Sequence, residues 1–78
     1  MTDKQQNQIR SASKFLRVVF DGELISVASI INAEANILTG TNVSENISTL
    51  INALEAVHEG CGDMINKLNK IKETYESV

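Results

Sequence analysis

The clearest structural pattern in the chain lies in residues 47–78, which read ISTLINALEAVHEGCGDMINKLNKIKETYESV. Apolar residues recur through this stretch alternately three and four positions apart, the heptad spacing that places one stripe along a helix. The stripe consists of Ile47, Leu50, Leu54, Val57, Cys61, Met64, Leu68, Ile71, Tyr75 and Val78. We therefore predict a long helix over residues 44–77 that buries one face against another helix.

The first half of the chain predicts a second long helix, over residues 9–39. Its apolar residues lie on one side when successive residues are turned by roughly 100°. They are Ile9, Ala12, Leu16, Val19, Phe20, Leu24, Val27, Ala28, Ile31, Ala35 and Leu38. Phe15, Ile30, Ala33 and Ile37 widen this apolar arc on one flank. An arc of that width indicates two packing partners.

Two local alternatives remain open in this half. Residues 15–22, FLRVVFDG, are also typical of a strand entering a turn, although no second strand-like run exists to pair with them. If the segment is helical, Gly22 costs roughly 1 kcal/mol relative to alanine, so a kink or break is expected there. Residues 1–8 are polar, and they either fray or form a first helical turn capped by Asp3.

The connection between the two predicted helices lies at residues 40–43. Gly40 suits the left-handed residue that closes a helix, and Asn42 followed by Glu45 is typical of a capping box. Because the connection is short, the two helices must be antiparallel neighbours. The sequence thus predicts an all-α fold in which residues 1–78 form a single helical-hairpin domain with arms of roughly 45–50 Å.

The small size of the chain predicts self-association. A lone hairpin buries too little apolar surface to offset the cost of ordering its residues, which is on the order of 110 kcal/mol. One cysteine cannot close an internal disulfide, and one cysteine with one histidine is too few for a structural zinc site. We therefore expect an antiparallel four-helix-bundle homodimer. Its predicted interface consists of Leu24, Val27, Ile31, Leu38, Leu54, Val57, Cys61 and Met64.

Charge is unevenly distributed along the chain, which has a formal net charge of −3. Residues 21–66 contain acidic residues and no basic ones, a separation that favours antiparallel pairing of two copies. The basic residues form a candidate nucleic-acid patch of Lys4, Arg10, Lys14, Arg17, Lys67, Lys70 and Lys72. Two features count against that use, because an acidic chain is repelled overall by phosphate and no aromatic residue is interleaved with the basic positions.

Motifs for enzyme chemistry are absent from the sequence, including phosphate loops, dinucleotide fingerprints, paired carboxylates and metal-ligand spacings. We therefore predict no enzyme, and no catalytic, cofactor-binding or metal-binding residues. His58 and Cys61 resemble a nucleophilic Cys/His pair, but core packing explains Cys61 better. The polar residues 1–8, and the lack of a run of ~20 apolar residues, predict a cytoplasmic protein without a membrane segment.

A row of apolar packing residues does not identify a ligand or substrate, so the sequence predicts only a general functional class. We predict a small non-enzymatic protein-binding or regulatory module that acts as a helical homodimer with an unidentified protein partner. One alternative is a nucleic-acid-binding regulator that uses the basic end of the hairpin. Another is a chaperone-like small subunit whose seam is completed by a different protein.

Overall fold

The two long helices expected from the apolar spacing are each interrupted, so the fold has four helices in place of two. The computed structural model describes residues 1–21, 24–57 and 61–76, and every regular element in these ranges is an α-helix. The helices are α1 (Asp3–Val19), α2 (Leu24–Thr39), α3 (Val43–Ala56) and α4 (Gly62–Glu76). The all-α class is confirmed, and a strand starting at Phe15 is wrong because that residue lies inside α1.

The predicted two-helix hairpin is wrong. Phe20 ends α1 with φ −97° and ψ 24°, and Val57 ends α3 in an extended conformation with φ −92° and ψ 128°. In the sequence a glycine follows each end, Gly22 and Gly60, and glycine is roughly 1 kcal/mol less favourable than alanine in a helix. A straight hairpin would bury one seam. Folding each arm in half lets one chain bury an apolar face of each of its four helices in a common core.

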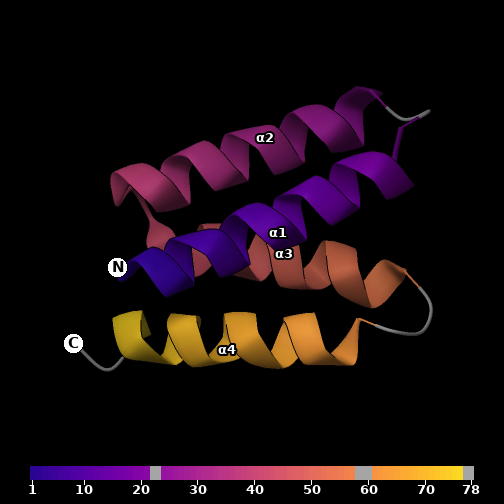
Figure 1. The fold of residues 1–78 in the computed structure, drawn as a ribbon. Coiled ribbons are helices and arrows are strands. Elements are labelled where there is room, and N and C mark those ends of the chain that lie inside the picture. The colour runs from indigo at the N-terminus through magenta and orange to yellow at the C-terminus, as the bar shows by residue number, and fades with distance from the viewer. Residues whose placement is uncertain (22–23, 58–60, 77–78) are drawn as a thin grey trace.

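Successive helices run in alternating directions along the molecule. Figure 1 shows α1 and α2 as one antiparallel pair and α3 and α4 as a second, with α1 crossing in front of α3. Among the described residues, α2 packs against α1 and α3 but makes no contact with α4, so it lies at the edge of the bundle. The start of α1 and the end of α4 lie on the same side of the molecule (Figure 1).

The N-terminal residues are helical and capped. Thr2 accepts a hydrogen bond on its Oγ1 atom from the backbone N–H of Gln5 at 3.1 Å, and its own N–H donates to Gln5 Oε1 at 2.9 Å. These two bonds form a capping box, which satisfies backbone donors that a frayed end would leave to water. Residues 3–8 therefore belong to α1, and the cap is Thr2 where the sequence suggested Asp3.

The turn from α2 to α3 follows the predicted left-handed geometry at Gly40, which has φ +82°. The N–H of Thr41 bonds to the Asn36 carbonyl at 2.8 Å and that of Gly40 to the Ile37 carbonyl at 3.2 Å, the double closure of a Schellman motif. The predicted capping box at Asn42 is wrong, because that residue is left-handed, with φ 44°, and its side chain makes no capping bond.

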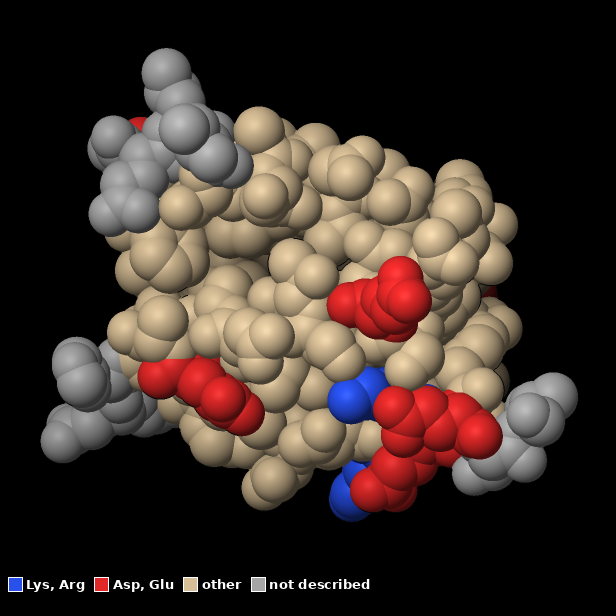
Figure 2. All heavy atoms as spheres, turned by 180° about the vertical axis from the view of Figure 1, so that it is seen from behind, with Lys and Arg blue, Asp and Glu red and all other residues tan. Residues whose placement is uncertain are grey.

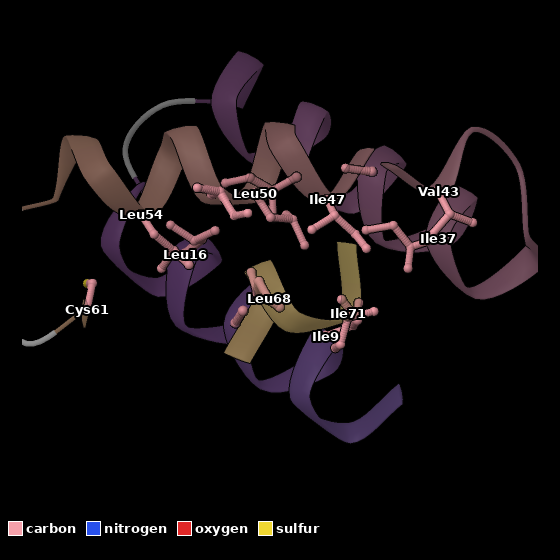
Figure 3. Close-up of a cluster of buried hydrophobic side chains, with 14 residues drawn as sticks. Ile9, Leu16, Ile37, Val43, Ile47, Leu50, Leu54, Cys61, Leu68 and Ile71 are labelled. Atoms are coloured by element: carbon pink, nitrogen blue, oxygen red, sulfur yellow. The ribbon is translucent and has the colours of Figure 1, made fainter. Parts of the chain in front are cut away.

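One hydrophobic core joins the four helices (Figure 3). Leu54 and Leu68 have 0% and 1% of their surface exposed, and the predicted stripes of α1, α3 and α4 supply most of the other members. The core consists of Ile9, Ala12, Leu16, Ile30, Ala33, Ile37, Val43, Ile47, Leu50, Ile51, Leu54, Cys61, Leu68 and Ile71. The sequence thus predicts the inward faces of α1, α3 and α4, but their partners belong to the same chain.

The dimensions of the chain are those of a folded monomer. Its radius of gyration is 11.5 Å, and a globular domain of this length has about 11.5 Å. The accessible surface is 4925 Å², against about 4,700 Å² for a folded monomer of this mass. A second copy is therefore not required to bury the core, which corrects the premise of the predicted four-helix homodimer.

Candidate interaction surfaces

Helix α2 has apolar residues on two faces, and only one face is buried. Ile30, Ala33 and Ile37 point into the core, whereas Ile31 leaves 46% of its surface exposed. The second apolar face consists of Ala28, Ile31, Ala35 and Leu38, and we call it the outer stripe. Its members are spaced three, four and three residues apart, so they form one row along the helix. Leu38 is half-buried against the core, and the other three are exposed.

The outer stripe carries no charge. Glu34 is the one charged residue of α2, and its Oε2 atom accepts a hydrogen bond of 2.9 Å from Ser13 Oγ on α1. Ser13 is fully buried, so this bond turns the carboxylate toward α1 and away from the outer stripe. The polar residues Ser29 and Asn32 lie on the other exposed flank of the helix. The outer stripe is therefore an uncharged apolar row between a bonded carboxylate and a polar flank.

The structure separates the residues of the predicted dimer interface. Leu54 and Cys61 are buried in the core of the single chain, and Val57 and Met64 are half-buried against it. On α2, Val27 and Leu38 are half-buried as well, and Ile31 is exposed. Leu24 begins α2, and its side chain lies outside the described residues. Among the described side chains of the predicted interface, Ile31 alone is exposed in the single chain.

Sequence reasoning missed an apolar surface at the end of α1. Val18 leaves 70% of its surface exposed, the most among the described large hydrophobic residues, and Val19, which was predicted on the apolar face, leaves 44%. Val18 lies off the apolar stripe of its helix, which is the signal that could have identified it. It borders a shallow hollow with Lys14, Arg17 and Asp21, so its surroundings are charged and differ from the outer stripe.

The seven predicted basic residues do not form one patch. Lys4, Lys67 and Lys70 come together where α1 and α4 lie side by side. Lys72 pairs with Glu76 at 3.4 Å, and Arg10 is exposed on α1. Figure 2 shows the opposite side of the molecule, where acidic groups are spread over a largely uncharged face and basic groups lie only toward the edge formed by α4.

Lys14 and Arg17 line the hollow beside Val18, at the other end of α1 from Lys4. Arg17 is half-buried, and its Nε atom is buried without a hydrogen-bond partner among the described residues. This part of the predicted patch therefore combines one exposed lysine with one partly covered arginine.

The hollow between α1 and α4 has two adjoining parts, of about 520 and 430 Å³. Lys4, Gln8 and Lys67 line both parts, and we call the whole hollow the lysine groove. One part is lined further by Asn7, Ser11, Asp63 and Met64. The other part is lined further by Thr2, Gln5, Lys70, Ile71 and Thr74. Lys67 Nζ lies 2.9 Å from Asp63 Oδ2, in a pair exposed to water on both sides.

Cys61 is a free thiol with 3% of its surface exposed, as expected for a core residue. His58 lies outside the described residues, so the predicted Cys/His neighbourhood is not placed. Within residues 1–21, 24–57 and 61–76, no three His, Cys, Asp or Glu side chains are grouped as a metal site would require. No helix in the described part of the chain is long and apolar enough to span a membrane.

The chain matches no protein-family model, no curated protein and no solved structure.

Proposed function

We propose that this protein is a small, non-enzymatic protein-binding module that works as a homodimer, with two copies paired through the outer stripe of α2. The observation that supports this pairing is the exposure of Ile31 in an uncharged apolar row whose members repeat at heptad spacing. In a single chain of 78 residues, this exposed row contributes little burial of apolar surface. It would contribute more if another surface covered it.

The outer stripe is complementary to itself. Ala28 and Ala35 lie on either side of Ile31, close to equal distances along the helix. An antiparallel pair of α2 helices with its two-fold axis near Ile31 would place Ala28 of one copy opposite Ala35 of the other. Small side chains let two helix backbones approach closely, and the larger Ile31 would fill the space near the axis.

Charge also favours a second copy over a strongly charged partner. Two copies carry the same net charge of −3 and repel each other at long range, so their contact must add no further pair of like charges. The outer stripe meets that condition because Glu34 is bonded to Ser13 at its edge. A single helix face is smaller than the ~800 Å² per partner of a standard interface, so we expect a weak, reversible dimer.

The test is sedimentation velocity from micromolar to millimolar concentration, comparing Ile31→Asp with Ser29→Asp. Both variants add one negative charge to an exposed position of α2, but only Ile31 lies in the outer stripe. The unmodified chain and Ser29→Asp should shift toward twice the chain mass as concentration rises, whereas Ile31→Asp should stay monomeric. A monomer at every concentration, or equal dimerisation of the two variants, would refute the proposal.

The chaperone-like alternative depends on a seam left open for another protein. The seam residues of α3 and α4 are covered by helices of the same chain, so this alternative gains no support.

A further inference from the structure

The lysine groove brings together basic residues that are far apart in the sequence. Lys4 lies in the first turns of α1, and Lys67 and Lys70 lie one turn apart on α4. They line one hollow because α1 and α4 pack side by side. Lys4 and Lys70 are exposed, and so is Lys67, which means that all three ammonium groups can meet a ligand in solution.

Charge in the lysine groove is opposite to that of the whole protein. In the part lined by Lys70, three lysines and no described carboxylate surround a hollow of about 430 Å³. The chain as a whole is acidic, with ten acidic and seven basic residues. Three of the seven basic residues nevertheless line this one hollow. Positive groups that share a hollow repel one another, and the local potential attracts a ligand with several negative charges.

The neutral residues of the lysine groove can also bind oxygen anions. Asn7, Gln8 and Ser11 line it with side-chain N–H and O–H donors, which hydrogen-bond phosphate oxygens without adding charge. Asp63 is the one described carboxylate in the lining, and it pairs with Lys67 at the surface, where both side chains are exposed. Such an exposed pair exchanges readily for a stronger anion.

We propose that the lysine groove binds a run of phosphate groups, as carried by a nucleic-acid backbone or by a linear polyphosphate. A run is required because the lysines come from two helices and line a hollow that extends along both. A nucleic acid would contact the groove through its backbone, since no aromatic residue for base stacking is among the described lining residues.

The test measures binding of a fluorescent oligothymidylate by anisotropy and of tripolyphosphate by calorimetry. Lys4→Gln combined with Lys70→Gln removes two charges from the groove, and Arg10→Gln combined with Lys14→Gln removes two exposed charges elsewhere on the chain. With about 0.7 counterions released per phosphate contact, the groove variant should lower the salt slope for the oligothymidylate by about 1.4. At ~0.1 M salt that corresponds to about 25-fold weaker binding, while the charge-matched control should change it by less than about threefold.

Four outcomes decide the proposal. Loss of oligothymidylate binding in the groove variant alone supports it and identifies a nucleic-acid backbone as the ligand. Selective loss of tripolyphosphate binding, with no oligothymidylate binding by any form, supports it and identifies a small polyphosphate. Equal loss in the two variants would mean that net charge alone attracts the probes, and absence of binding to both probes would mean that the groove is not a phosphate site. Either of the last two results overturns the proposal.

Discussion

Leu54 and Ile31 belong to the same predicted interface, yet their environments are opposite. Leu54 has none of its surface exposed, whereas Ile31 leaves nearly half exposed. The difference arises because the stripe of α3 faces the centre of the bundle, while α2 turns Ile30 and Ile37 inward in place of Ile31. An apolar residue at heptad spacing therefore indicates a contact face but not which molecule supplies the contact.

At Leu54 we expect that truncation to alanine lowers the free energy of unfolding by about 2–5 kcal/mol, because it leaves a cavity in the core. The loss should be independent of protein concentration, since the cavity lies within one chain. Ser29→Ala, on the exposed flank of α2, should change the free energy by less than about 0.5 kcal/mol. Urea unfolding followed by circular dichroism measures both, and similar losses in the two variants would show that the assigned helix faces are incorrect.

The helices are delimited by backbone geometry at their ends as well as by their apolar faces. Gly40 closes α2 with φ +82°, a conformation that side-chain-bearing residues adopt at a cost. Gly62 begins α4, and its φ is not in the left-handed region. A Cβ atom added at either glycine would meet no other group within 4 Å, so the space around the two positions is alike. They differ only in the conformation that the backbone requires.

Gly40→Ala should therefore destabilise the fold, whereas Gly62→Ala should not. The first should destabilise the fold by about 1–2 kcal/mol, because alanine must adopt the left-handed conformation of the Schellman motif. The second should be neutral or stabilise by up to about 1 kcal/mol, because alanine favours the helical state and restricts the unfolded chain. Differential scanning fluorimetry of the two variants beside the unmodified protein measures the signs. A shift of both melting temperatures in the same direction would contradict this account.

The whole molecule has the dimensions of one folded unit, 37 × 24 × 19 Å. A straight hairpin with arms of about 30 residues would reach roughly 45 Å along its axis. The shorter length results from the breaks at Phe20 and Val57, which return the chain over itself. The same return brings α1 beside α4 and so creates the lysine groove, while leaving α2 at the edge with the outer stripe exposed.

This architecture predicts that folding and dimerisation are separable. Below the dissociation constant of the proposed outer-stripe dimer, the melting temperature should not depend on concentration, and above it the temperature should rise as association stabilises the folded state. Ile31→Asp should remove the rise and keep the baseline. Scanning calorimetry at several concentrations measures this, with an expected heat-capacity change of about 1 kcal/mol/K for a chain of ~78 residues. A melting temperature that rises with concentration in Ile31→Asp as well would show that the core itself requires a second copy.

Neighbouring residues in the sequence predict the helical class, most of the inward-facing residues of α1, α3 and α4, and the left-handed turn at Gly40. These features follow from neighbouring residues, because apolar spacing selects the face of a helix and a glycine selects the conformation that ends it. The concentration of basic residues toward the two ends of the chain is also evident from the sequence. The sequence does not show that Lys4, Lys67 and Lys70 line one hollow while Arg10 and Lys14 lie elsewhere.

Which helix faces pack against one another within the chain depends on the tertiary structure. Breaking each arm costs little, because the chain carries glycines that already disfavour a continuous helix by roughly 1 kcal/mol each. Burying a Leu or Ile side chain stabilises the folded state by roughly 1.5–3 kcal/mol. A chain that folds back therefore offsets the cost of each break by burying its own apolar residues, without a second copy. Because the chain is interrupted between α1 and α2, the inward face of α2 need not continue the apolar face of α1. It buried Ile30, Ala33 and Ile37, and left Ile31 at the surface.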